Sequence, residues 1–281
     1  MSVRFLVLIL LALLAAPASA RKPKPPPPPP PPKPMRIGIF YDARSIAAFG
    51  ERGLRHVGPL LVDREKVLFA NSGIDPDLYR WELVYRGTLP ADFVVEDPCD
   101  LEGLLGRAAQ DQRVQQVLKQ HEIAVPVFLF YCRDVRGSAG VTPIAPRTAK
   151  DYTRNVLIGF VGLQTNAVYN PDTDSLWPSD VAAHEFGHAA GGNHPVEQTT
   201  SDAPTTGPSE FPWARGILIP QGPGEPPRCD VMGTFTCIRE PWYSNTAFPG
   251  RGNPQADVAR AIVLNWNRLA DIPKVRERFL Y

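Results

Sequence analysis

Three histidines and a glutamate stand close together in the second half of the 281-residue chain, at spacings that could hold a metal ion. His184 and His188 are four residues apart, which on a helix places both imidazoles on one face, as two corners of a zinc tetrahedron. Glu185 can reach a water on the metal without being a ligand itself. Gly191 lets the helix end in a left-handed turn, which can bring His194 back as the third ligand. The fourth position then stays open for water, as a catalytic zinc site requires.

The competing interpretation is a helix whose histidines are merely buried or solvated. The string H-E-F-G-H-A-A-G-G-N-H, from His184 to His194, arises by chance far less often than its H-E-x-x-H core alone. It resembles the metzincin zinc metallopeptidases, because it matches their H-E-x-x-H-x-x-G-x-x-H pattern position for position. The resemblance implies one catalytic zinc ion held by the three histidines.

The resemblance continues after the third histidine. The string C-D-V-M-G at 229–233 looks like the Met-turn, a tight loop whose methionine, here Met232, packs beneath the metal. Residues 242–245 and the helix after them look like the end of the reprolysin (adamalysin) catalytic domain. We expect that helix to start at Asn253 with Pro254 in its first turn. Its buried residues would be Val258, Ile262, Trp266 and Leu269.

Substrate contacts are expected on two sides of the metal. An extended peptide would add as a strand to the glycine-rich sheet edge that contains Gly140, Val141 and Thr142. The resemblance places the residues after the Met-turn, including Thr234 and Tyr243, at the wall of the pocket for the residue that follows the cut. Their side chains do not predict which residue that pocket prefers.

The sequence therefore predicts an exported zinc-dependent endopeptidase in which Glu185 takes the proton from the activated water and passes it to the leaving amine. Two alternatives stay open: a zinc hydrolase of non-peptide amides such as cell-wall cross-links, and a non-catalytic secreted zinc-binding or adhesion module. The presence of Glu185 argues against the second. Pro195 and Thr234 depart from the patterns of individual metzincin subfamilies, so the subfamily stays open.

The first 34 residues differ in composition from the rest. Residues 1–20 combine Arg4, an apolar run and the string A-S-A, which predicts a signal peptide and export to the periplasm, cell envelope or medium. The run is too short to span a bilayer comfortably, so we expect no transmembrane anchor after cleavage. Residues 21–34 contain eight consecutive prolines and predict an extended spacer, in preference to a docking site or envelope tether. Residues 35–281 form the predicted catalytic domain.

Charge and cysteine content indicate the partners and the compartment. Residues 1–34 contain five basic residues and no acids, so residues 35–281 carry a formal charge of −4 although the whole chain carries +1. A protein or peptide substrate is expected and a nucleic acid is not, because phosphate binding needs a basic face. The four cysteines of an exported chain allow three disulfide pairings. Cys229 and Cys237 bracket one loop, which favours their pairing and leaves Cys99 with Cys132.

The order of apolar patterns predicts the fold. Strands are expected at residues 35–41, 79–86, 124–131, 137–145 and 155–163, and helices at 57–71 and 104–121. With the resemblance, this order indicates an α/β (α+β) zincin-like fold. It would have a twisted mixed sheet of about five strands, an active-site helix and a smaller C-terminal subdomain after His194. Asn170, Asp172 and Asp174 are spaced like the opening of a calcium loop, but its glycine and closing glutamate are missing, which favours an ordinary turn.

Overall fold

The computed structural model describes residues 30–93, 97, 99–132, 140–141, 161–165, 177–198, 211–234 and 237–280. The chain divides into two compact units, Met1–Pro31 and Pro32–Tyr281, and the second contains every helix and strand named below. The predicted signal peptide and the predicted turn at 170–174 lie outside the described residues. Within the described ranges, no helix is both long and apolar enough to cross a bilayer.

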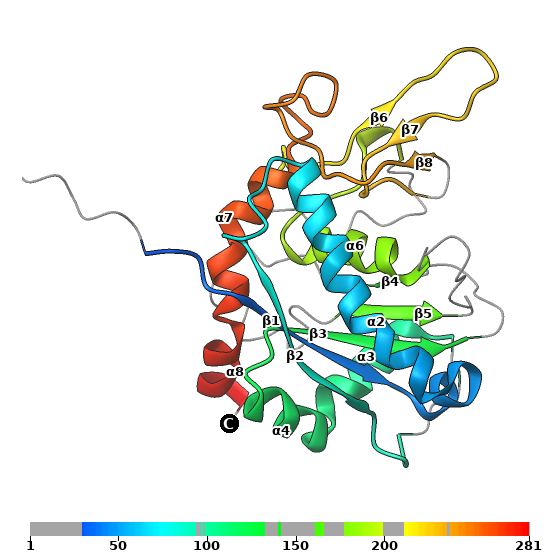
Figure 1. Ribbon diagram of the computed structural model, residues 1–281, viewed down its shortest axis with the longest axis vertical. Coiled ribbons are helices and arrows are strands. Elements are labelled where there is room, and N and C mark those ends of the chain that lie inside the picture. Colours follow the sequence, from blue (N-terminus) through cyan, green and yellow to red (C-terminus); the bar gives the residue numbers. More distant parts are fainter. Residues whose placement is uncertain are drawn as a thin grey trace, which may run out of the picture. The chain divides into compact units, whose positions relative to one another are not determined.

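The second unit is built around a five-stranded mixed sheet, as the sequence predicts (Figure 1). The strands are β1 (Met35–Tyr41), β2 (Trp81–Thr88), β3 (Val125–Tyr131), β4 (Gly140–Val141) and β5 (Val161–Thr165). Their order is β2-β1-β3-β5-β4, and β4 pairs antiparallel with β5 while the other pairs are parallel. Ile37 of β1 lies opposite Val125 of β3. β3 is buried from Val125 to Phe130, as expected for a parallel strand covered on both faces.

Alternate side chains of the central strands belong to two different cores. The helices around them are α2 (Ala43–Asn71), α3 (Leu101–Gln110), α4 (Gln112–Gln120), α6 (Trp177–Ala189), α7 (Val258–Ala270) and α8 (Ile272–Leu280). Ile39 and Val127 pack in a core with α2, α6 and α7, whereas Phe40 and Phe128 pack in a core with α3 and α4. Because side chains alternate along a strand, the sheet lies between two layers of helices.

The first helix begins earlier than predicted. α2 starts at Ala43 and not at Val57, because Asp42 caps it by accepting the Ser45 N–H at 2.8 Å. Gly50, with φ 69°, interrupts the helical path between the two starting points. The apolar spacing used for the prediction therefore marked only the part of α2 that follows this break.

The single helix predicted over residues 104–121 is two helices. Asp111 ends α3 in an extended conformation, with φ −72° and ψ 116°. Its side chain accepts the N–H groups of Arg113 and Val114 and so caps α4. An aspartate inside an apparently continuous amphipathic pattern therefore acts as a helix boundary.

The chain after His194 forms a small sheet and then returns to the main core. The short strands β6 (Leu218–Ile219), β7 (Arg228–Cys229) and β8 (Ile238–Arg239) pair in the order β6-β7-β8. They lie on the opposite side of α6 from the five-stranded sheet (Figure 1). α7 then packs against β1 and the core beneath α2 and α6. The predicted C-terminal subdomain thus shares its core with the upper part of the fold.

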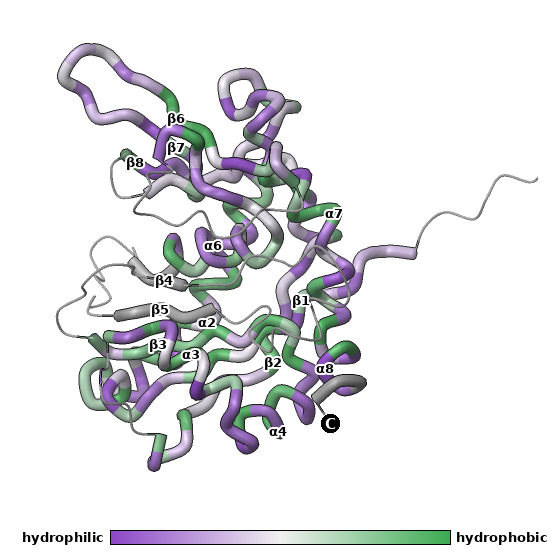
Figure 2. The backbone as a smooth tube through the Cα atoms, turned by 180° about the vertical axis from the view of Figure 1, so that it is seen from behind, coloured by the Kyte–Doolittle hydropathy of each residue, from purple (hydrophilic) through white to green (hydrophobic). Residues whose placement is uncertain are grey.

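The last predicted helix has the expected buried face but a different start. Its fully buried residues include Val258, Ile262, Trp266 and Leu269, as predicted. The hydrophobic and hydrophilic residues that alternate along α7 are visible in Figure 2. The predicted start at Asn253 is wrong, because Asn253 accepts the Gln255 N–H in a turn (2.8 Å) and Asp257 caps the helix through the Arg260 N–H.

Candidate metal centre

The end of α6 delivers the third histidine to the first two. His184 and His188 lie on one face of α6 and are 6% and 3% exposed. The Gly192 N–H donates to the carbonyl five residues earlier (2.7 Å), and the Gly191 N–H donates to the carbonyl of His188 (2.9 Å). These two bonds form a Schellman motif, in which Gly191 has φ 98°. The turn brings His194 beside the helix, as the sequence predicts.

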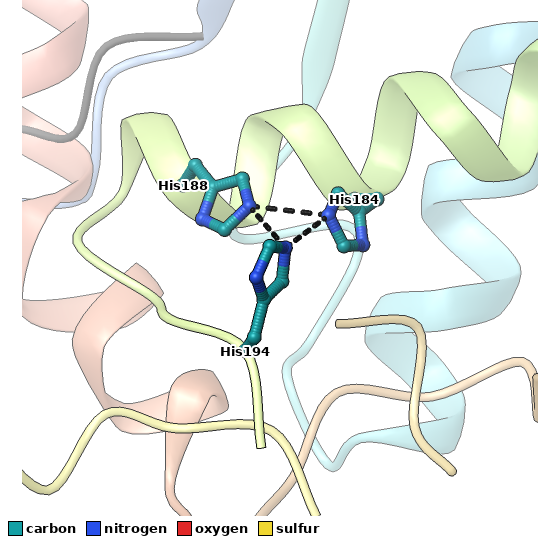
Figure 3. A group of neighbouring side chains, drawn as sticks. All are labelled: His184, His188 and His194. Carbon is teal, nitrogen blue, oxygen red and sulfur yellow. Dashed lines mark hydrogen bonds between the residues drawn. The ribbon is translucent and has the colours of Figure 1, made fainter. Parts of the chain in front are cut away.

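The three Nε2 atoms form a nearly equilateral triangle (Figure 3). The Nε2 atom of His194 lies 3.0 Å from that of His184 and 3.1 Å from that of His188, and the last two are 3.1 Å apart. Ligand nitrogens on a zinc tetrahedron with bonds of 2.0–2.1 Å lie about 3.3 Å apart. The spacing therefore fits three imidazoles around one small metal ion.

Main-chain carbonyls decide which nitrogen of two imidazoles carries the proton. His184 Nδ1 lies 2.9 Å from the carbonyl oxygen of Val231, and His188 Nδ1 lies 2.9 Å from that of Gly192. A carbonyl oxygen only accepts, so both Nδ1 atoms donate and both Nε2 atoms carry lone pairs. Two facing lone pairs 3.1 Å apart repel each other unless a cation lies between them. This donor set could therefore hold a metal ion.

The electrostatic surroundings keep the imidazoles neutral. Burial, with the charges of neighbouring histidines and Arg239, lowers the pKa of His188 to about 3 and holds the pKa of His184 well below its usual value. Burial and Arg239 also lower the pKa of His194. The neutral imidazole is the form that binds a metal, so the site stays ready to bind it down to acidic pH.

The predicted Met-turn lies directly against α6. Met232 is fully buried, and a Cβ atom added to Gly187 would overlap its sulfur. Gly187 lies between the two histidines in the sequence of α6. Because glycine has no side chain, the Met232 sulfur can contact the helix at this residue. The carbonyl of Val231, the residue before Met232, orients His184. The turn thus supports both the backbone of the helix and one imidazole.

Both predicted disulfides are present. Cys229 and Cys237 have Cα atoms 5.9 Å apart and close the loop that contains Met232. Cys99 and Cys132 have Cα atoms 5.3 Å apart and join the start of α3 to the end of β3. No cysteine of the chain is left free. The Cys229–Cys237 disulfide constrains the loop that packs against α6, and the Cys99–Cys132 disulfide lies away from the histidines, between α3 and β3.

Sequence reasoning missed Asp230, which ties the Met-turn to the end of the chain. Its side chain is fully buried and accepts the N–H groups of Ile217 (3.2 Å) and Ser244 (2.8 Å). Burial raises the pKa of Asp230 to about 7 although these bonds oppose the shift. Ser244 in turn accepts the N–H of Val258 at the first turn of α7 (3.0 Å). The residue lay inside the recognised C-D-V-M-G string, but nothing in the string indicated its partners.

Two charged residues accompany the histidine cluster. Glu185, 4% exposed, follows His184 on α6. Arg239 of β8 donates from Nε to the carbonyl of Gly233 (2.7 Å). Burial lowers the pKa of Arg239, while Asp180, Glu185 and other nearby acids act in the opposite direction. A carboxyl group and a guanidinium cation therefore both lie near the three imidazoles.

Tyr243 is not a substrate contact, so this prediction is wrong. Its side chain is fully buried, and its hydroxyl donates to the carbonyl of Ala183 in α6 at 2.8 Å. The same oxygen lies 3.3 Å from a carboxyl oxygen of Glu65 in α2. Burial, together with Glu65, raises the pKa of Tyr243 well above its usual value. The tyrosine supports the metal-binding helix from the core and cannot reach a bound peptide.

The structure describes three of the other four residues predicted to contact the substrate. Gly140 and Val141 form β4, the last strand at its edge of the five-stranded sheet, as the edge prediction requires. Thr142 lies outside the described residues. The Thr234 N–H donates to the side chain of Gln198 (2.9 Å), which joins the Met-turn to the loop after the third histidine.

Comparison with known proteins adds information on the fold alone. No family model matches the sequence, and no curated protein matches it. A solved structure described as "Structure of a chaperone-substrate complex" is similar, with a TM-score of 0.59 and 14% sequence identity. The match covers 85% of this chain and 34% of that one, so this chain spans about a third of the other's length. At this identity the likeness shows a shared mixed α/β fold.

Proposed function

We propose that the chain is an exported zinc-dependent endopeptidase of the metzincin type. The observation that supports it is the convergence of three Nε2 atoms within 3.1 Å of one another, beside the buried Glu185. Three imidazole nitrogens suit zinc, whereas magnesium and calcium prefer oxygen ligands. The H-E-x-x-H-x-x-G-x-x-H resemblance supports peptide hydrolysis as the reaction.

A zinc ion bound at such a site supplies a Lewis acid that lowers the pKa of water and polarises a carbonyl group. The three histidines would hold the ion, and the carbonyls of Val231 and Gly192 keep two of them in the ligating tautomer. Glu185 would accept the proton of the attacking water and donate it to the leaving amine. Hydrolysis then breaks one C–N bond and yields a carboxylate and an amine.

The surroundings of the site support a peptide substrate and an exported enzyme. β4, with Gly140 and Val141, lies at the sheet edge and offers main-chain groups to which an extended peptide can add as a strand. Two disulfides, with no membrane-spanning helix in the described ranges, fit an extracellular protein. The same α6 machinery could hydrolyse another amide, so the substrate has to be tested directly.

The test uses the purified full chain against casein and against peptidoglycan, with and without a zinc chelator. We expect casein hydrolysis that the chelator abolishes and that added zinc restores, with about one zinc per chain by elemental analysis. Hydrolysis of peptidoglycan alone would overturn the peptidase proposal in favour of a cell-wall amide. Bound zinc without hydrolysis of either substrate would indicate a binding module.

A further inference from the structure

A hollow of about 430 Å³ lies beside the loop that carries the third histidine. It is lined by Val196, Pro212, Trp213, Arg215 and Gln255. Val196 follows His194 by two residues and begins the short helix η1 (Val196–Gln198). We call this hollow the Arg215 pocket. None of its lining residues belongs to the metal centre described above.

Main-chain hydrogen bonds fix the Arg215 pocket to the metal centre. The Asn193 N–H donates to the carbonyl of Ala214 (2.8 Å), and the Gly216 N–H donates to the carbonyl of Asn193 (2.7 Å). Arg215 therefore lies alongside the residue that directly precedes His194. The Ser244 hydroxyl also donates to the carbonyl of Arg215 (2.7 Å). A ligand in the pocket would be held in a fixed position relative to the three imidazoles.

The guanidinium group of Arg215 has one donor that no acceptor in the described part of the chain satisfies. Its Nη1 atom is buried and makes no hydrogen bond. In the described part of the chain, neither Arg215 nor Arg260 forms an ion pair, and the guanidinium carbon of Arg260 lies 4.7 Å from the centre of the Trp213 ring. A buried N–H donor without an acceptor is unfavourable, and native proteins seldom leave one unused. The Arg215 pocket thus contains one guanidinium group with an unsatisfied donor, and the guanidinium group of Arg260 lies over the Trp213 ring that also lines it.

A guanidinium group beside apolar side chains suits a ligand that has a carboxylate and a short apolar chain. A guanidinium group offers parallel N–H donors that match the two oxygens of a carboxylate. Val196, Pro212 and Trp213 add apolar surface that can cover the methylene groups of a longer acidic side chain. We infer that the Arg215 pocket binds the carboxylate of an acidic residue in the peptide substrate, an assignment that rests on the proposed function.

The test measures the preference for glutamate over glutamine at each position of a peptide. Overlapping casein peptides are made in pairs that differ by one Glu or Gln, and kcat/KM is measured for each pair. At one position, we expect glutamate to raise kcat/KM by about 10- to 100-fold, mainly through KM. Arg215→Gln should bring the preference at that position close to one. Arg215→Lys, which keeps the charge but loses the fork, should keep part of it.

The control is Arg55→Gln, which removes one exposed positive charge from α2, away from the lining of the pocket. It should keep the full preference, so that loss in Arg215→Gln is not an effect of net charge. The absence of any position with a glutamate preference would overturn the assignment. An equal preference in wild type and Arg215→Gln would also overturn it.

A binding measurement separates this assignment from the proposed function. The same peptides, fluorescently labelled, are titrated with Glu185→Gln protein, with and without Arg215→Gln, and anisotropy is recorded. Tighter binding of the glutamate peptide that depends on Arg215 would support the pocket even if wild type cleaved no peptide. Equal binding of both peptides at all positions would contradict the pocket while leaving peptide hydrolysis untouched.

Discussion

On the α3/α4 side of the sheet the buried residues are almost all apolar, and Phe128 and Phe130 stack there with ring centroids 6.1 Å apart. The one buried polar side chain from those helices, Gln115, donates to the carbonyl of Ala109 (2.7 Å). On the α2/α6 side, the helices that cover the same sheet also bury polar side chains, among them Glu65 of α2 and His184, Glu185 and His188 of α6. The helices on the two faces of the sheet therefore differ in how many polar side chains they bury.

The apolar face mainly contributes to folding stability, whereas the α2/α6 face also contains the candidate site. Burying polar groups weakens folding unless each finds a partner, whereas burying phenylalanine and leucine strengthens it. The α2/α6 face satisfies many of its polar groups through the main chain: carbonyls accept from His184, His188 and Tyr243, and N–H groups donate to Asp230. The α3/α4 face contributes burial without such demands. Substitutions on the two faces should therefore affect different measurements.

The largest effect is expected at Glu185. Glu185→Gln keeps the size of the side chain but removes the base, so peptide hydrolysis should fall by about 10²–10⁴-fold or more. Zinc content should stay near one per chain, because the three histidines are unchanged. Glu122→Gln, at an exposed residue paired with Arg36, is the matched control and should be as active as wild type. A Glu185→Gln protein with wild-type turnover would end the proposed mechanism.

The opposite pattern is expected for Phe130 on the apolar face. Phe130 is 1% exposed, and Phe130→Ala should lower the free energy of unfolding by about 3–5 kcal/mol. Zinc affinity and kcat/KM per folded molecule should change little, because the α2/α6 core lies on the other side of the sheet. Urea denaturation gives the stability and a chelator competition gives the affinity. A loss of zinc affinity as large as the loss of stability would show that the faces are coupled.

The buried carboxyl group of Glu65 should make stability depend on pH. Burial raises its pKa to about 8, against opposing contributions from Tyr243 and Arg64 and with a smaller one from Asp180. The Tyr243 hydroxyl donates to Ala183, so a protonated Glu65 can donate to the hydroxyl oxygen. Since the folded pKa exceeds the unfolded value, this stabilisation is complete below about pH 4.5 and is lost as the pH rises towards 8.

Glu65→Gln removes this titration without changing the shape. From pH 5 to 8, wild type should lose stability relative to Glu65→Gln, by on the order of 3 kcal/mol in total. Urea denaturation of both zinc-loaded proteins at each pH measures the difference, in which the contributions of the histidines cancel. Parallel stability curves over this range would mean that Glu65 is already ionised in the folded protein.

The two disulfides should differ in what their removal damages. Serine replacement of Cys229 and Cys237, eight residues apart, should cost about 2–3 kcal/mol of stability, and that of Cys99 and Cys132, 33 apart, about 4 kcal/mol. The shorter loop contains Met232, so its opening should reduce zinc affinity more, despite the smaller loss of stability. Denaturation and zinc titration of both double variants test this. The reverse order of zinc affinities would show that the Met-turn holds its shape without the disulfide.

Local patterns predicted much of this structure. The central strands β1 and β3 follow apolar runs, His184 and His188 share a helix face because of their spacing, and Cys229 and Cys237 pair across a short loop. The errors concern residues whose role depends on distant partners. Tyr243 lies in a segment assigned to the substrate wall, but its hydroxyl bonds to Ala183, 60 residues earlier. No spacing rule within a segment contains that information.

Asp230 shows the same limit at the candidate site. The sequence predicts only that it belongs to a turn, yet its carboxyl group accepts from the N–H of Ser244, 14 residues later, and from that of Ile217, 13 residues earlier. The start of α7 was misplaced because Asn253-Pro254 suits either a helix start or a turn. The Asp257 cap, with its bond from Thr246, decides in favour of the turn. Where a local sequence suits both a helix start and a turn, contacts with distant residues in the folded chain decide between them.

The carbonyls of Val231 and Gly192, which orient two of the imidazoles, belong to the main chain and not to any side chain. A replacement at either position keeps the carbonyl oxygen itself, although a side chain at 192 would come within 2.9 Å of the Gly187 carbonyl oxygen. Insertions and deletions in the turn after α6, or in the loop before Met232, would displace them. Related sequences should therefore keep the lengths of both loops constant, with glycine at 192 and an apolar residue at 231, because Val231 is buried in the core.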